Sequence, residues 1–183
     1  MELNPTGYVI LGMLSAQPQS GYEIKALVDT TTRFFWAASY GQIYPELKRL
    51  SELGLIEGMS APTGGRRRTV YRISSDGRAA LRDWLRQPPA TYEMREEGLL
   101  KLFFAGALPP GEGGGILASM REHRLNLAQR LRSMEPEALA KEDPFPLMVL
   151  RAGIEFNEWF AGWCERTERQ LLNPVPERGA ADV

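Results

Sequence analysis

The stretch SYGQIYPELKRLSELGLIEG, residues 39–58, constrains the fold of this chain more than any other part of the sequence. Ile43, Leu47 and Leu50 recur at the spacing of one apolar stripe on an α-helix. Gly54 is a stop signal for that helix, because glycine readily adopts the left-handed conformation found at helix C-termini. The apolar residues that follow are typical of a β-strand. The stretch therefore predicts a half-buried helix that leads directly into a strand.

Pro45 occupies an unfavourable position inside this helix. Ser39 and Gln42 have the spacing of a capping box, so the helix begins well before the proline. There the proline ring clashes with the carbonyl of Gly41 and removes one hydrogen bond, which costs roughly 3 kcal/mol. At 100° per residue, Gly41, Pro45 and Lys48 lie opposite the apolar stripe. Since glycine lets a ligand approach the backbone closely, we interpret this face as a surface for close contact with another molecule.

The predicted elements around this helix define a fold class. In chain order they are a helix at 6–16, a helix from Ser20, the helix above, strand-like runs at 55–60 and 69–74 around a loop at 61–67, and a helix from Ser75 or Asp76 to Pro88. This is the order of a winged helix-turn-helix. In that architecture the helix before the hairpin enters the major groove, and the hairpin loop grips the flanking backbone.

Basic residues gather where the hairpin is predicted. The net charge is only −1, but residues 1–90 carry 11 basic and 8 acidic side chains, against 11 and 15 in residues 91–183. Four arginines and no acid lie between Glu57 and Asp76. This local patch matters more than the total, because charges act on phosphates within a Debye length of about 8 Å.

We expect this face of the chain to bind double-stranded DNA. Gln42 and Lys48 are the expected readers of base edges, since Gln pairs with adenine in two places and Lys reaches guanine acceptors. The hairpin arginines would add salt-sensitive contacts to phosphates or to the minor groove. The predicted DNA-binding residues are Ser39, Tyr40, Gly41, Gln42, Tyr44, Pro45, Lys48, Arg49, Arg66, Arg67 and Arg68. The alternative is a winged-helix adaptor that binds protein rather than DNA.

The N-terminal half also resembles the PadR family of bacterial transcriptional regulators. The resemblance rests on SGYEI at 20–24, SYGQIYPELKRLSELGLI at 39–56 and GGRRRTVYRISSDGRAAL at 64–81. The second run matches the recognition helix of the family, and the third matches its wing and the following helix. The resemblance implies a homodimeric, usually repressing, DNA-binding protein that releases its site on meeting a small-molecule effector. The C-terminal half would resemble the helical dimerisation domain of the longer branch of the family.

The chain is expected to divide near Pro88 to Thr91. We predict a winged helix-turn-helix DNA-binding domain at 1–87, a helical dimerisation domain at 92–172 and a disordered tail at 173–183, so that the fold is mainly α with a small β-hairpin. The expected C-terminal helices lie at 95–108, 115–134 and 147–172. GEGGG at 111–115 is expected to be a flexible loop, without the strand and the Gly-Lys-Ser/Thr ending of a P-loop.

The last helix carries a broad aromatic stripe whose packing partner the sequence leaves open. Phe156, Trp159, Phe160 and Trp163 are the predicted dimerisation residues, because two or three helices bury so much aromatic surface poorly without a partner chain. The alternative is packing against the long helix at 116–134 of the same chain. A two-fold dimer would place two recognition helices on the half-sites of a palindromic operator.

Other features of the sequence exclude several classes of function. Cys164 and His123 are each the only residue of their type, which excludes a Cys/His zinc site and an intrachain disulfide. No nucleophile–base pair or cofactor loop is present, so we expect no enzyme and no cofactor. No apolar run reaches the roughly 20 residues of a membrane span, and a cytoplasmic protein is expected. Trp36 and Trp84 are candidates for an apolar effector pocket.

Overall fold

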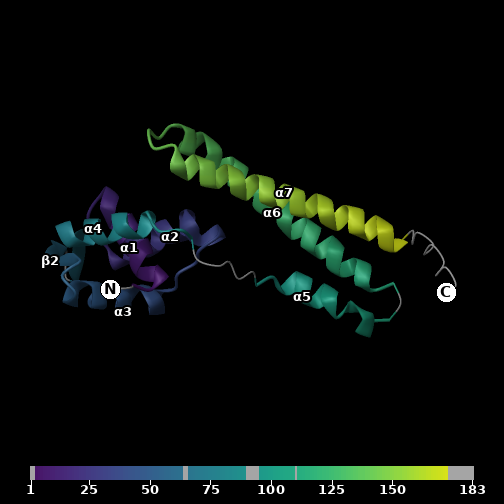
Figure 1. The fold of residues 1–183 in the computed structure, drawn as a ribbon, viewed down its shortest axis with the longest axis horizontal. Coiled ribbons are helices and arrows are strands. Elements are labelled where there is room, and N and C mark those ends of the chain that lie inside the picture. Colours follow the sequence, from purple (N-terminus) through teal and green to yellow (C-terminus); the bar gives the residue numbers. More distant parts are fainter. Residues whose placement is uncertain (1–2, 64–65, 90–94, 110, 173–183) are drawn as a thin grey trace. The chain divides into compact units, whose positions relative to one another are not determined.

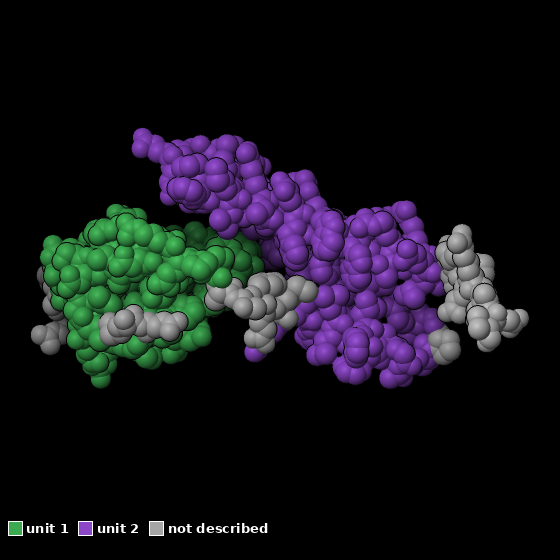
Figure 2. All heavy atoms as spheres, in the orientation of Figure 1, with its two compact units in different colours: residues 1–91 green, residues 92–183 purple. Residues whose placement is uncertain are grey.

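The computed structural model describes residues 3–63, 66–89, 95–109 and 111–172, and for residues 60–63, 66 and 67 it describes the backbone alone. The chain forms two compact units, residues 1–91 and 92–183 (Figure 2). Helices dominate both units, and the described strands form one small antiparallel sheet (Figure 1). The predicted fold class, mainly α with an N-terminal winged helix-turn-helix, is confirmed.

The first unit contains the elements expected from the sequence and one additional strand. In chain order they are α1 (Pro5–Ala16), β1 (Gln19–Ser20), α2 (Gly21–Thr30), the short 3-10 helix η1 (Thr32–Phe34), α3 (Tyr40–Glu52), β2 (Ile56–Thr63), β3 (Arg66–Ile73) and α4 (Ser75–Leu85). The strand order is β1-β3-β2, so the predicted two-stranded hairpin is completed by a short third strand. Gln19 pairs with Tyr71 and Ser20 with Val70, which joins the start of α2 to the wing.

The wing strands are longer than the sequence predicted. The loop expected at 61–67 is largely strand, because β2 continues to Thr63 and β3 begins at Arg66. Pro62 is tolerated within β2 because that strand lies at the edge of the sheet and has a neighbouring strand on one side only. The N–H that proline lacks is therefore not needed for pairing with a second strand. The three consecutive arginines therefore begin a strand rather than occupy a loop.

The apolar stripe of α3 fixes this helix in the core. Ile43, Leu47 and Leu50 are fully buried, together with Ile10 of α1 and Ile24 of α2. Burying each such side chain stabilises the fold by about 1.5–3 kcal/mol. The opposite face of α3 is thereby turned to solvent, as the periodicity predicted.

The connection from α3 to the wing is locked by the start of α4. Gly54 ends α3 with a positive φ of 71°, as expected for a C-terminal stop, and the N–H of Leu55 returns to the carbonyl of Leu50 at 2.9 Å. The Ser74 hydroxyl donates to the Gly54 carbonyl at 2.7 Å, and the Ser74 N–H donates to the Leu55 carbonyl at 3.0 Å. Ser74 is also the N-cap of α4, one residue before the cap expected at Ser75 or Asp76.

The second unit is helical throughout its described part. Its elements are α5 (Glu97–Phe103), the 3-10 helix η2 (Ala105–Ala107), α6 (Gly113–Leu139) and α7 (Phe145–Leu172). The two long helices, α6 and α7, lie side by side (Figure 1). Leu117, Met120, Phe160 and Cys164 form a buried cluster between them.

Helix α6 is longer at both ends than the sequence predicted. It begins at Gly113, inside the glycine run expected to be a loop, because the first turn of a helix needs no intrahelical acceptors for its N–H groups. It also continues through Pro136 to Leu139. Pro136 and Arg132, whose carbonyl loses its donor, are both exposed, so water can satisfy that carbonyl. The tail predicted at 173–183 lies outside the described residues.

Arg124 connects the three helices of this unit. Its guanidinium donates to Asn157 Oδ1 of α7 at 3.1 Å and forms an ion pair with Glu96 at the start of α5. The same group lies 4.5 Å from the centre of the Phe160 ring. Asn157 is buried and donates in turn to the Gly153 carbonyl at 2.7 Å. A paired charge thus orients α5 and α7 on α6.

A substitution at Gly77 would test the α4 junction. A Cβ on Gly77 would lie 2.1 Å from the Leu55 carbonyl oxygen, so we expect Gly77→Ala to lower the free energy of unfolding by about 2 kcal/mol or more. Gly12→Ala is the matched control, because a Cβ there meets nothing within 4 Å. Urea denaturation of both variants measures the difference. Equal stability of the two would contradict this account of the junction.

Candidate nucleic-acid interface

The exposed face of α3 that carries Gly41, Pro45 and Lys48 is called its front. Two of these residues, the glycine and the proline, are disfavoured in helices. Gly41 and Pro45 both lie on the solvent side, and a Cβ added to Gly41 would meet only Ser39 Oγ, at 3.8 Å. The fold would therefore accept alanine at residue 41, which is more favourable than glycine in a helix by about 0.8–1.0 kcal/mol. Packing within this chain explains neither residue. A smooth front suited to close approach of another molecule explains both.

The first flank of this front is aromatic and lies against α2. The rings of Tyr40 and Tyr44 stack with centroids 6.1 Å apart, and both side chains are about half exposed. Lys25 Nζ of α2 lies 5.2 Å from the centre of the Tyr40 ring and pairs with Asp29. Gly21 lets α2 come this close, since a Cβ there would lie 2.9 Å from Tyr44 Cε1. These contacts with α2 hold the two tyrosine rings at the edge of the front.

The second flank is polar and lies against α1. Glu46 is buried in spite of its charge, and the amide of Asn4, the N-cap of α1, donates to it at 2.6 Å. Arg49 Nη1 donates to the other carboxylate oxygen at 3.1 Å. Because a buried carboxylate needs such partners, the pair holds Arg49 at the edge of the exposed face. The sequence assigned Arg49 to the interface but gave no signal for Glu46 or Asn4.

The start of α3 is closed by the capping box that the sequence predicted. The Ser39 N–H donates to Gln42 Oε1 at 2.9 Å, and the Ser39 hydroxyl donates to the same oxygen at 3.1 Å. Both contacts occupy the carbonyl oxygen of the Gln42 side chain. The two-point adenine contact expected for Gln42 requires that oxygen, so with the cap closed only the NH2 group remains available.

Lys48 is the most accessible basic side chain on the front. Its Nζ lies 3.8 Å from Glu52 Oε1, and both side chains are largely exposed. An exposed pair of this kind contributes about 0–1 kcal/mol. A phosphate or a base edge can therefore displace Glu52 at small cost. The role of Lys48 as a reader of base edges stays a prediction.

The wing arginines differ in what the structure shows of them. Arg66 and Arg67 pair through their backbones with Thr63 and Pro62 of β2, and their side chains lie outside the described part of the structure. Arg68 forms an ion pair with Glu23 of α2. The remaining arginine of the patch, Arg72, pairs with Glu57 across the hairpin at 2.6 Å.

Glu23 is held in its charged form by these contacts. The hydrogen bond from Arg68, followed by those from the N–H and hydroxyl of Ser20, lowers the pKa of Glu23 from 4.5 to about 2. Because the folded-state pKa is lowered, the contribution to stability is fully present above pH 4.5 and is lost as the pH falls toward 2. Glu23 is therefore charged at every physiological pH.

The predicted dimerisation residues differ in their exposure to solvent. Phe156 and Trp159 of α7 are exposed, at 43% and 59% of their full surface. Phe160 is buried in the core of its own chain with Leu117 and Cys164, and Trp163 packs partly against the same cluster. Phe160 thus belongs to the intramolecular packing that the sequence left open, whereas the first two remain free for a partner.

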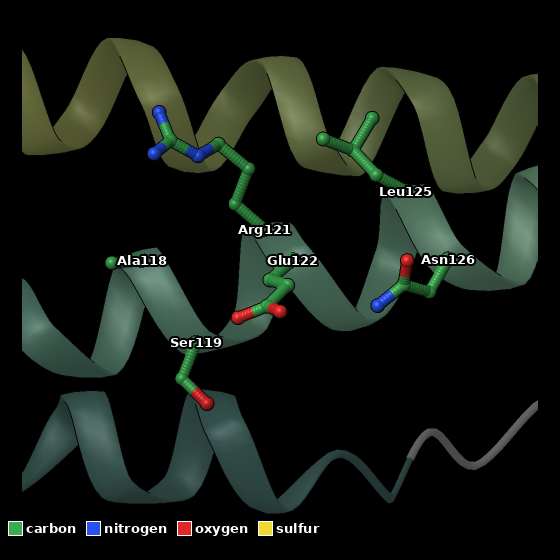
Figure 3. A pocket seen from close by; sticks show the side chains of 6 residues that line it. All are labelled: Ala118, Ser119, Arg121, Glu122, Leu125 and Asn126. Atoms are coloured by element: carbon green, nitrogen blue, oxygen red, sulfur yellow. The ribbon is translucent and has the colours of Figure 1, made fainter.

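Of the surface cavities in the described part of the second unit, we consider two, and the tryptophans proposed for an effector line neither of them. One groove of about 520 Å³ runs along α6 (Figure 3) and is lined by Ala118, Ser119, Arg121, Glu122, Leu125 and Asn126. Another of about 520 Å³ is almost wholly apolar and lies between α5, η2 and Ile116. Trp84 stacks on Tyr8 at 4.5 Å, and Trp36 is partly exposed. Their effector role stays a prediction.

Other classes of site find no support among the described residues. None of the helices that the structure describes is long and apolar enough to cross a membrane. Within the same residues, histidine, cysteine and carboxylate side chains form no group of three that could hold a metal ion. Cys164 is buried, and burial raises the pKa of its thiol.

The helix α3 with its exposed front, the wing and the supporting helices define a winged helix-turn-helix protein. Residues 10–83 match the model of the transcriptional regulator PadR-like family, and residues 94–171 match the virulence activator alpha C-terminal model. The negative transcriptional regulator PadR of Bacillus subtilis is 28% identical over 168 residues, which cover 86% of this chain and 92% of that protein. The chain belongs to the PadR-like family of transcriptional regulators.

Solved structures agree with this assignment. The crystal structure of Bacillus subtilis PadR in complex with operator DNA has a TM-score of 0.83 at 26% identity and covers 92% of this chain and 99% of that chain. The same protein in complex with p-coumaric acid gives a TM-score of 0.74 at 25% identity, covering 94% and 99%. Both structures match more than nine-tenths of this chain, so the similarity includes residues of both of its units.

A charge at the cap of α3 would test the role of its front. Gln42→Glu keeps the capping box, since Glu and Gln both serve at this position, but it places a carboxylate at the exposed front. We expect unchanged or slightly higher thermal stability, because an acid suits a helix N-terminus. We expect duplex DNA affinity to fall about tenfold or more, equivalent to about 1.4 kcal/mol. Fluorescence anisotropy and thermal unfolding measure the two effects, and unchanged affinity would remove Gln42 from the interface.

Proposed function

We propose that this chain is a homodimeric repressor that binds a palindromic operator through α3 and the wing and leaves it on binding a small molecule. The observation that carries the DNA-binding role is the front of α3, where Gly41 and Pro45 stand exposed without a structural reason of their own. Free N–H groups at a helix start bind phosphate oxygens, and a bare front brings them close. Tyr44, Lys48 and Arg49 surround that front with hydrogen-bond donors.

Known relatives support the finer parts of the proposal. The Bacillus subtilis relative is named a negative regulator, and its structures hold operator DNA in one case and p-coumaric acid in another. By analogy, we assign this chain a duplex DNA target and a small aromatic effector. Since the proposed target is DNA, we infer a cytoplasmic protein. Residues 1–87 would form the DNA-binding domain and residues 92–172 the dimerisation domain.

The dimer is supported by the exposed face of α7. Phe145, Val149, Ala152, Phe156 and Trp159 follow one another at alternating steps of four and three residues and are all exposed. This is the spacing of a helix seam that packs against another helix. A two-fold dimer through this seam would place two copies of α3 on half-sites about 34–36 Å apart.

Binding to the DNA upstream of its own gene tests the function. We expect wild-type protein to bind one such duplex specifically and to weaken steeply as salt rises, since several phosphate contacts release counterions. Arg66→Ala/Arg67→Ala should lower the affinity for every sequence. Retained dimerisation without binding to any duplex would favour the protein-binding adaptor instead.

Gly41→Ala tests whether the front of α3 serves DNA binding rather than the stability of the protein. The variant should be as stable as wild type or more stable, by up to about 1 kcal/mol. Its operator affinity should fall about tenfold, because a methyl group would hold the duplex away from the helix start. Gly12→Ala, also within a helix but in α1, serves as the control and should bind normally. Normal binding by Gly41→Ala would contradict the proposed role of the front.

Substitution of the α7 seam tests the dimer. Phe156→Ser/Trp159→Ser should raise the dimer dissociation constant by roughly 1,000-fold, since large aromatic anchors contribute about 2 kcal/mol or more each and about 1.4 kcal/mol is tenfold. Leu139→Ser, at an exposed apolar residue near the end of α6, is the control. Sedimentation equilibrium measures the constant, and unchanged association would place the interface elsewhere.

A further inference from the structure

Two capping boxes of this chain differ at one chemical group. Ser20 and Glu23 close the start of α2, and Ser39 and Gln42 close the start of α3. Glu and Gln are equally able to fill this role. At α3 the neutral residue suits a surface that meets phosphates. At α2 the residue is a glutamate, whose carboxylate both caps the helix and forms an ion pair with Arg68 of the wing.

The Glu23 carboxylate is already fixed before the arginine reaches it. Its Oε2 accepts hydrogen bonds from the Ser20 N–H at 2.8 Å and from the Ser20 hydroxyl at 2.9 Å. Its Oε1 is left for Arg68. Exposed ion pairs are usually weak because two long side chains must be ordered together. Here only the arginine has to be ordered, and the low pKa of Glu23 keeps the charge in place.

The location of Arg68 on the wing gives this pair a mechanical consequence. β3 is held on one side by β1 only at Val70 and Tyr71. Arg68 lies two residues further toward the tip, where β2 is the one strand paired with β3. The ion pair is therefore the last described contact that ties the wing to the helices before the stretch that carries Arg66 and Arg67.

We propose that Arg68 is a positioning residue, which through Glu23 fixes the outer part of the wing to α2, and that it is not itself a phosphate contact. This inference rests on the proposed DNA-binding function and revises the role that the sequence assigned to Arg68. A wing held in this way would meet the same duplex as the front of α3. Removal of the acid Glu23 from this DNA-binding surface then weakens binding instead of strengthening it.

The experiment compares full-length wild type with Arg68→Gln, Glu23→Gln and the double variant on a duplex that wild type binds, over a series of salt concentrations. Glu23→Gln preserves the capping box and removes only the charge. We expect both single variants to bind about three- to fivefold more weakly, the size of an ion pair of this exposure. The double variant should bind no more weakly than either single one, and the slope of log affinity against log salt should not change.

Glu57→Gln is the matched control. It removes an acid from the neighbouring strand, where Glu57 pairs with Arg72 within the hairpin, and it should leave the affinity unchanged or slightly raised. Thermal unfolding confirms that each variant is folded at the assay temperature.

Two results would overturn the proposal. A phosphate contact by Arg68 would lower the salt slope by about one in Arg68→Gln and would let Glu23→Gln bind more tightly. Unchanged affinity in both single variants would show that the pair has no role in binding. Failure of wild type to bind any duplex would instead refute the proposed function, so the two failures are distinguishable.

Discussion

The recognition half of this protein depends on the complete burial of one stripe of α3. With Ile43, Leu47 and Leu50 in the core, the rotation of the helix about its axis is fixed, and every other side chain of the helix has a defined direction. The same rotation places the tyrosines toward α2 and Glu46 toward α1. Since sliding or turning the helix would expose these apolar residues at about 1.5–3 kcal/mol each, the front stays rigidly presented.

The sequence predicted those features that depend on local periodicity and local chemistry. The stripe of α3, its capping box and the glycine stop at Gly54 each involve residues within about one helical turn of each other, and all are present in the structure. The exposed face of α3 followed from the same periodicity. Long-range pairings were not accessible in this way. Nothing near Arg68 in sequence indicates that its partner is Glu23, 45 positions earlier, so an arginine expected to be free is found paired.

The predicted boundaries of helices and strands were wrong where the surroundings of a residue outweigh its own conformational preference. Glycines at 113–115 and Pro136 argued against helix, yet α6 includes them, because the first turn needs no intrahelical acceptors and the carbonyl freed by the proline is exposed to water. The short strand β1 was missed because two residues carry no periodicity. Phe160 shows the same limit, since the aromatic stripe alone cannot distinguish the face that packs on α6 from the face that is exposed.

The engaged carbonyl oxygen of Gln42 has a consequence for the DNA sequences that such a protein accepts. A side chain with only its NH2 group free can donate but not accept. In the major groove, N7 is an acceptor on adenine and guanine alike, whereas only adenine offers a neighbouring donor that would need the occupied oxygen. At the base pair that faces this residue, the NH2 group could donate to N7 of either purine, to O6 of guanine or to O4 of thymine, and only cytosine would offer it no acceptor. The operator would therefore be degenerate at that position, where the side chain would recognise an acceptor in the groove and not one fixed base.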